Sequence, residues 1–150
     1  MKFLIAGLGS IGRRHLRNLV TLGERDILLF RTHHSTLPGD ELVSFPTQTD
    51  LMTALKMQPK AVIVSNPTAL HLDVAIPAAE AGCHLFLEKP ISDALDKRVK
   101  TLKDIVSSKG LKVLVGFQFR FHPVLVQLKA LIASEIMVGP FSCRIYWDEY

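Results

Sequence analysis

The sequence predicts an α/β fold: a doubly wound, mostly parallel sheet with helices on both faces, followed by the start of a second α/β domain. Short, nearly continuous apolar runs alternate with stretches of helical periodicity, as expected for strands buried between two helix layers. The character changes near residue 117, because seven of the eleven aromatic residues fall in the last 34 positions. We therefore expect a first domain over residues 1–120. Residues 121–150 are expected to form a crossover helix and the first strand of a truncated second domain.

Five apolar runs are predicted strands, and the stretches between them are predicted helices. The strands are residues 3–8, 27–30, 61–64, 85–87 and 112–117. The helices are residues 11–22, 51–57, 68–81 and 92–108. Gly82 and Gly110 follow the last two helices, where glycine favours a left-handed C-terminal cap. Residues 32–47 contain two prolines and one glycine and are predicted to be a loop with at most a very short strand.

Residues 141–148 alternate apolar and polar side chains, as a strand with one buried face does. No second strand of this kind follows, so the apolar side chains would be exposed unless another sheet covers them. We expect either that these residues belong to the front part of a longer protein or that another chain supplies the missing sheet. Such an exposed edge favours a homo-oligomer.

The composition is that of an ordinary soluble protein, with 48% hydrophobic and 21% charged residues. The net charge of +4 suits an anionic partner, but the basic residues are scattered, so a phosphate-bearing small molecule explains it as well as nucleic acid does. No basic stripe with interleaved aromatic residues points to nucleic acid. Cys83 and Cys143 lie far apart, which predicts neither a metal site nor a disulfide framework and fits a reducing cytoplasm. No apolar run reaches the ~20 residues of a membrane span.

A glycine-rich motif, Gly-Leu-Gly-Ser-Ile-Gly from Gly7 onward, joins the first predicted strand to the first helix. In this context it is the dinucleotide fingerprint of a Rossmann sheet. Gly7 makes the tight turn, Gly9 lets a pyrophosphate approach the backbone, and Gly12 allows close helix packing. The free N–H groups of this segment, which includes Ser10 and Ile11, would bind the phosphates at the positive end of the helix. The alternative is a glycine-rich turn without a ligand.

Three arginines follow in the first turns of that helix, where cations oppose the helix dipole. These are Arg13, Arg14 and Arg17. A negative group nearby would compensate, and the alternative is a solvated basic face.

The end of the second strand bears on the choice of cofactor. An NAD-specific fold usually has an acid about 20 residues after the fingerprint, to bind the ribose 2′-hydroxyl. Here Arg31 and Thr32 follow the strand, and no carboxylate lies between Asp26 and Asp40. Because a guanidinium can pair with a 2′-phosphate, we favour NADP over NAD. The alternative is that Arg31 is a solvated strand-end residue.

Polar residues also follow the 61–64 strand, at the edge of the sheet where ligands of open α/β sheets bind. Thr68 is predicted to cap the next helix, which leaves Asn66 to point into the crevice. His71 lies one turn into that helix and is either a site residue or simply a helix residue. The predicted cofactor contacts of this segment are Ser65, Asn66, Pro67 and His71.

Glu88, Lys89 and Pro90 follow the 85–87 strand. A lysine at this place can reach the crevice, donate a hydrogen bond to a carbonyl or hydroxyl group, and transfer a proton. Most lysines are surface charges, so the chemistry of Lys89 alone does not decide between a site residue and a surface charge.

Taken together, the motifs resemble the Gfo/Idh/MocA oxidoreductases. The resemblance spans essentially the whole chain, in the family's order. It rests on the glycine motif, Asn66-Pro67 with His71, Glu88-Lys89-Pro90, and Gly-Phe-Gln-Phe-Arg-Phe-His-Pro over residues 116–123. It implies a Rossmann domain followed by a substrate and oligomerisation domain with a large open antiparallel sheet. Such enzymes oxidise or reduce a sugar, cyclitol or related polyol with NAD(P).

The resemblance also implies roles for individual residues. Lys89 would be catalytic, binding the reacting oxygen and helping to position the nicotinamide ribose. Glu88 would orient the cofactor or the lysine, and Pro90 would fix the turn. Asn66 and His71 would line the nicotinamide side.

Arg120, with its neighbours Gln118 and His122, would lie where the crossover meets the substrate domain. A second catalytic group, an Asp and a His of the substrate domain, would lie beyond Tyr150. The resemblance therefore agrees with the truncation inferred from residues 141–148.

Two functional classes fit these observations. One is an NAD(P)-dependent sugar or polyol oxidoreductase, of which this chain is the cofactor-binding part and which is inactive without the rest. The other is a non-catalytic nucleotide-binding or sensor module. Lys89 favours the enzyme, because a sensor has no use for a lysine beside the nicotinamide.

Overall fold

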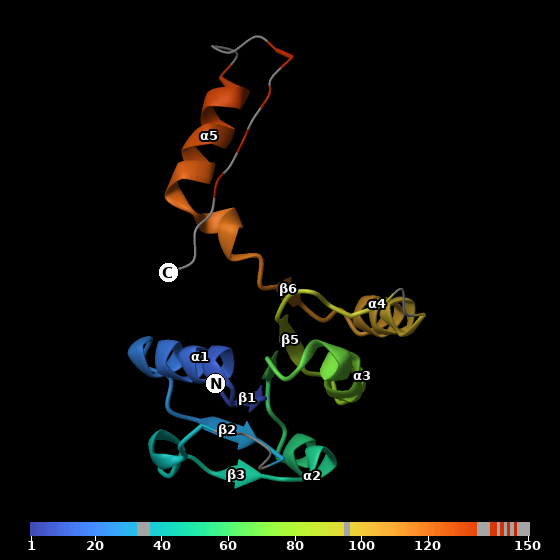
Figure 1. The fold of residues 1–150 in the computed structure, drawn as a ribbon. Helices are drawn as coiled ribbons and strands as arrows, with labels where there is room; N and C mark the ends of the chain where they lie inside the picture. The colour runs from blue at the N-terminus through green and yellow to red at the C-terminus, as the bar shows by residue number, and fades with distance from the viewer. Residues whose placement is uncertain are drawn as a thin grey trace. The chain divides into compact units, whose positions relative to one another are not determined.

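Six parallel strands form one sheet in the order β3-β2-β1-β4-β5-β6 (Figure 1). The computed structural model describes residues 1–32, 37–94, 97–134, 139–140, 142, 144 and 146. The strands are β1 (Phe3–Ala6), β2 (Ile27–Phe30), β3 (Thr47–Gln48), β4 (Ala61–Val64), β5 (His84–Leu87) and β6 (Val113–Val115). The chain winds outward from β1 in both directions, so the strand order reverses between β1 and β4. This confirms the doubly wound parallel sheet of a Rossmann fold.

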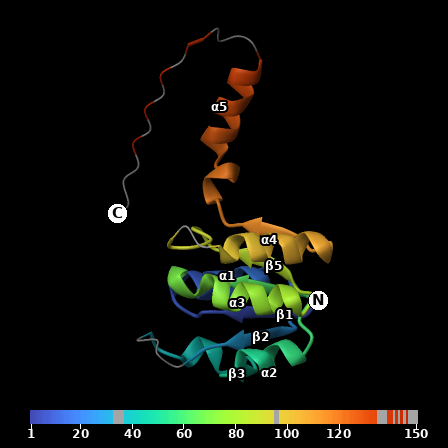
Figure 2. The ribbon, with the colours of Figure 1, turned by 90° about the vertical axis from the view of Figure 1, so that its right-hand side faces the viewer.

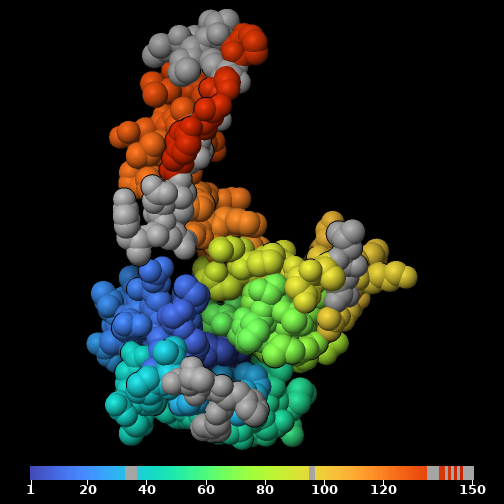
Figure 3. Space-filling model, in the orientation of Figure 1, coloured from blue at the N-terminus to red at the C-terminus, as the bar shows by residue number. Residues whose placement is uncertain are grey.

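Helices cover both faces of the sheet. The helix α1 (Ser10–Thr21) packs on one face, where the 3-10 turn η1 (Asp40–Leu42) also lies. The helices α2 (Leu51–Lys56), α3 (His71–Glu80) and α4 (Arg98–Ser108) pack on the other face. The helices α3 and α4 lie side by side (Figure 2). In the space-filling view α1 (blue) and α3 (green) lie on opposite sides of the first unit (Figure 3).

The central strands build two cores because neighbouring residues of a strand point to opposite faces. In β1, Leu4 belongs to the core under α2, α3 and α4, whereas Ile5 belongs to the core under α1. Leu28 and Leu29 divide in the same way in β2. All four side chains are at most 2% exposed. Strands buried on both faces explain the continuous apolar runs of the sequence.

The described chain divides into two compact units, Met1–Gly116 and Phe117–Tyr150. The second unit contains the 3-10 turn η3 (Gln118–Phe121) and the helix α5 (Pro123–Ala133). The division falls four residues before the domain boundary predicted at 120, at the glycine that follows β6. The strand predicted over residues 141–148 lies mostly outside the described residues.

Two helix starts differ from the prediction. The helix predicted from residue 92 begins at Arg98, and Ser92 Oγ instead accepts a hydrogen bond of 3.4 Å from the Ala94 amide. Such a local turn competes with the helix. Thr68 does not cap a helix with its side chain, because it opens the 3-10 turn η2 (Thr68–Leu70) that precedes α3. The capping glycines are confirmed, since Gly82 and Gly110 both have positive φ angles.

Among the described residues, no helix has the length and apolar character needed to cross a bilayer. The described residues likewise hold no group of three metal-ligating side chains. Cys83 is a buried free thiol that donates to the Pro59 carbonyl, and burial raises its pKa. Cys143 lies outside the described residues.

Candidate functional site

A groove of about 630 Å³ lies at the carboxyl ends of β1, β2 and β4. This is the point where the strand order reverses and where open α/β sheets bind ligands. Most residues predicted to contact a cofactor line it, namely Gly7, Gly9, Ser10, Ile11, Arg31, Thr32, Ser65, Asn66 and Pro67. Residues that the sequence reasoning missed also line it, namely Leu8, Phe30, Leu51, Leu70, Asp73 and Val74. The last three recur at helical spacing, which is the one signal that could have identified them.

The three motif glycines meet different surroundings. Gly7 has φ +89°, and a Cβ there would overlap the backbone of Asn66. A Cβ on Gly12 would overlap the carbonyl oxygen of Gly7. At Gly9 a Cβ would have no neighbour within 4 Å. The loop is therefore tightly packed at Gly7 and Gly12 and open at Gly9, the position predicted to face a pyrophosphate.

Ser65 and Asn66 connect β4 to the glycine loop. Ser65 Oγ lies 2.8 Å from the Gly7 carbonyl oxygen and 3.1 Å from the Ala6 carbonyl oxygen. Asn66 Nδ2 donates to the Leu70 carbonyl at 2.9 Å, whereas its buried Oδ1 has no partner in the described chain. Because an unpaired buried oxygen is costly, Oδ1 is suited to accept a hydrogen bond from a ligand in the groove.

Arg31 lines the groove directly after β2, as predicted. Its Nε is buried and has no hydrogen-bond partner in the described chain. Among the lining residues that the structure describes, the one carboxylate is Asp73, which lies on α3 and pairs with Arg98 at 2.6 Å. The β2 side of the groove thus offers an unpaired guanidinium donor, which fits a bound phosphate.

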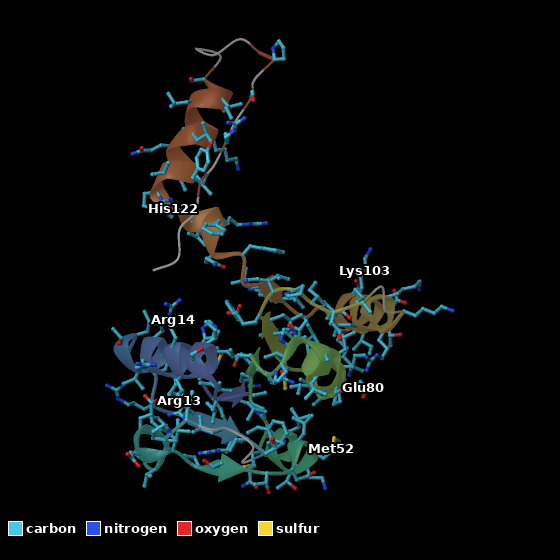
Figure 4. The ribbon with its side chains drawn as sticks, viewed as in Figure 1. Arg13, Arg14, Met52, Glu80, Lys103 and His122 are labelled. Atoms are coloured by element: carbon cyan, nitrogen blue, oxygen red, sulfur yellow. The ribbon has the colours of Figure 1, made fainter. Side chains whose placement is uncertain are left out.

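Arg13 and Arg14, adjacent on α1, have different surroundings (Figure 4). Arg14 is exposed, as a solvated basic face requires, whereas the Arg13 side chain is only 6% exposed. Arg13 Nη1 donates to Glu41 Oε1 at 2.8 Å, and its Nε donates to the Leu8 carbonyl at 2.9 Å. The group that compensates Arg13 is therefore the Glu41 carboxylate. The pair fastens the segment after β2 to the helix of the glycine motif.

Glu88, Lys89 and Pro90 follow β5 next to the groove and are not among its lining residues. Lys89 is exposed, and the Lys89–Pro90 peptide bond is cis. Glu88 Oε1 lies 2.8 Å from Nε2 of His15, a residue of α1 that sequence reasoning missed. His71 is 2% exposed, with both ring nitrogens against backbone carbonyls, and does not line the groove. The cofactor role predicted for His71 stays a prediction.

Arg120 belongs to the second unit, in η3. Its predicted cofactor contact and the catalytic role of Lys89 also stay predictions.

Comparison with known protein families shows to which family the chain belongs. A model of the Gfo/Idh/MocA oxidoreductase family, described as an NAD-binding Rossmann fold, matches residues 1–117. The chain belongs to this family. The matched residues are its NAD-binding Rossmann domain, and the match ends next to the boundary between the two units.

Relatives and solved structures agree with this assignment. The chain is 31% identical to scyllo-inositol 2-dehydrogenase (NAD(+)) of Bacillus subtilis, over 88% of this chain and 40% of the relative. It is 28% identical to D-xylose 1-dehydrogenase (NADP(+)) 2 of Haloferax volcanii, over 97% of this chain and 47% of the relative. The structure of apo scyllo-inositol dehydrogenase from Lactobacillus casei superposes with a TM-score of 0.74 at 25% identity, covering 89% of this chain and 41% of that one. The chain thus spans less than half the length of these proteins.

Proposed function

We propose that this chain binds NADP in preference to NAD. It would be the cofactor-binding part of an oxidoreductase that acts by hydride transfer on a sugar, cyclitol or related polyol. The observation that carries the proposal is the groove at the reversal of strand order, open at the Gly9 backbone and bordered by Arg31. The family assignment supports a nicotinamide cofactor. The names of the two relatives refer to a sugar and a cyclitol, which supports the substrate class.

The preference for NADP rests on the residues that follow β2. Arg31 Nε is buried without a partner in the described chain, so a 2′-phosphate would supply the missing acceptor. Glu41, the acid nearest Arg13, is held by the buried Arg13 guanidinium at 2.8 Å. This leaves Asp73 as the one carboxylate among the described lining residues, on the opposite side of the groove.

The cofactor supplies the two-electron redox step when bound, and the residues of the chain bind it and handle the proton. Gly9, Ser10 and Ile11 present backbone N–H groups at the start of α1 for the phosphates. Lys89 Nζ donates a hydrogen bond to the reacting oxygen of the substrate and takes up or releases its proton.

Titration of the chain with NADPH and NADH, followed by nicotinamide fluorescence, tests the proposal. We expect saturable binding of both, with NADPH bound more tightly. Arg31→Asp should weaken NADPH binding by about 10- to 100-fold, because one charge-assisted interaction is lost and a repulsive charge is introduced. NADH binding should change by less than about threefold.

Equal losses for both cofactors would remove Arg31 as the phosphate ligand. Failure of the unaltered, folded chain to bind either cofactor would overturn the proposed function as a whole. Arg14→Asp makes the same charge change at an exposed position on α1 that does not line the groove. It should leave the preference for NADPH over NADH in place.

A further inference from the structure

Two histidines from different helices contact the two residues that flank Lys89. His15, on α1, faces Glu88, and its Nε2 lies 2.8 Å from Glu88 Oε1. The His15 ring also packs edge-on against Phe86, with ring centroids 4.8 Å apart and planes at 64°. Phe86 and Glu88 are two residues apart at the end of β5, so both side chains leave the strand on the face that α1 covers. His15 therefore fixes the residue before Lys89 to the helix of the glycine motif.

His71, at the start of α3, fixes the residue after Lys89. Its Nδ1 lies 2.8 Å from the Pro90 carbonyl oxygen, and its Nε2 lies 2.9 Å from the Asn66 carbonyl oxygen. Carbonyl oxygens only accept hydrogen bonds, so a neutral ring can donate to one of them and a protonated ring to both. The protonated ring thus joins the Lys89 segment through two hydrogen bonds to Asn66, which lines the groove, whereas the neutral ring is bonded to one of the two carbonyls and only packs against the other.

Glu88 has little freedom to leave His15. The two side chains are 19% and 16% exposed. A Cβ on Gly116, directly after β6, would lie 3.2 Å from Glu88 Oε1. The carboxylate is thus enclosed between α1 and the end of β6, and the absence of a side chain at Gly116 leaves the room it occupies.

We propose that His15 and His71 are positioning residues that hold the backbone of Lys89 at a fixed place relative to the cofactor groove. This inference rests on the proposed function. Lys89 itself is exposed, and a long flexible side chain aligns its ammonium group well only when its backbone is held. The contact from His15 holds the Lys89 segment against α1, and the contact from His71 holds it against Asn66, which follows β4.

The proposal separates cofactor affinity from the placement of Lys89. The His15 ring does not line the groove and is not among the predicted cofactor contacts, so its removal should leave the affinity for NADPH nearly unchanged. The Lys89 side chain should then respond differently to bound NADPH. Removing a residue that merely stabilises the fold would change neither the affinity for NADPH nor the response of Lys89 to NADPH in the folded protein.

The test uses the 150-residue chain with its lysines reductively ¹³C-methylated, with the Lys89 signal identified by its loss in Lys89→Arg. In the unaltered chain, saturating NADPH should shift the Lys89 methyl signal. In His15→Phe, which keeps a ring against Phe86 but removes the N–H group, that shift should fall by about half or more while the Kd for NADPH changes less than about threefold. His15→Gln, whose side-chain amide can donate to Glu88, should restore part of the shift.

Asn18→Ala is the matched control, because Asn18 is exposed on the same helix one turn after His15. It should leave both the Lys89 shift and the affinity unchanged. His71→Leu provides the second arm, and His15→Phe decides the outcome if the buried His71→Leu variant does not fold.

The backbone amide of Lys89 gives a readout that needs no cofactor. Its ¹⁵N order parameter should be ~0.85 in the unaltered chain and lower, ~0.6, in His15→Phe. An unchanged order parameter together with an unchanged methyl shift would overturn the positioning role while leaving the proposed function intact. Binding of NADPH to the unaltered chain without any change in the Lys89 signal would remove Lys89, and with it both histidines, from the site.

Discussion

The two units of the chain differ in how they bury their apolar residues. In the first unit α3 buries six of its ten residues. In the second unit α5 is at least as apolar but none of its residues is buried, and Val124, Val126, Leu131 and Ile132 are all exposed. Helices of this length are stabilised mainly by packing, not by intrinsic propensity. The difference indicates that the first unit supplies its own core, whereas α5 lacks a covering surface in the described chain.

The same difference separates the two parts of the predicted site. The groove is built from residues whose positions are fixed by the two cores of the first unit. Arg120 and its neighbours lie in the second unit. Every described groove-lining residue belongs to the first unit, so we expect this unit to bind the cofactor without the second.

The largest effect is expected at Gly12. Gly12→Ala places a Cβ against the Gly7 carbonyl oxygen, so the backbone must shift, and the free energy of unfolding should fall by about 4 kcal/mol or more. Gly9→Ala is the matched variant. It meets open space, so stability should change by less than about 0.5 kcal/mol while NADPH affinity falls. Denaturant unfolding and NADPH titration of both variants check this, and equal stabilities would contradict the packing assigned to Gly12.

A smaller effect should distinguish the two units directly. Leu28→Ala removes a 2% exposed side chain from β2 and should destabilise the chain by about 3 kcal/mol. Leu131→Ala, on the exposed surface of α5, should cost less than about 0.5 kcal/mol. Urea unfolding curves measure both. A large loss for Leu131→Ala would show that α5 packs against a core after all.

Substitution of Arg13 should cause the smallest of these losses in stability. It tests whether the Arg13–Glu41 pair holds the segment after β2 against α1. Arg13→Ala removes the buried partner of Glu41 and the donor to the Leu8 carbonyl, at a cost of about 2 kcal/mol. Arg14→Ala, on the exposed side of the same helix, should cost less than about 0.5 kcal/mol. If thermal unfolding finds the two variants alike, Arg13 belongs to a solvated face.

The parts of the fold that the sequence predicts best are those set by local pattern. The strands at 27–30 and 61–64 agree with the prediction at both ends, because an apolar run buried on both faces has clear limits. The predicted start of α4 was wrong: residues 92–94 form a local turn in which Ser92 Oγ accepts a hydrogen bond from the Ala94 amide, and the helix begins at Arg98. Such competition between a local turn and a helix is decided by small energies that periodicity does not record.

Contacts between distant residues could not be predicted in this way. The glycine motif predicted the part of the groove formed by residues 7–11, because its spacing reports one local geometry. His15 carries no such pattern, and its partner lies 73 positions away, so only the folded sheet brings the two together. Arg13 meets Glu41 across 28 positions for the same reason.

The most direct test compares NADPH binding by the whole chain and by residues 1–116, after circular dichroism has shown that the shorter chain is folded. We expect dissociation constants within about threefold of each other, since every described groove residue lies in the first unit. A folded shorter chain that binds NADPH more than about tenfold more weakly would contradict this expectation, and would place a cofactor contact, with Arg120 the first candidate, in residues 117–150.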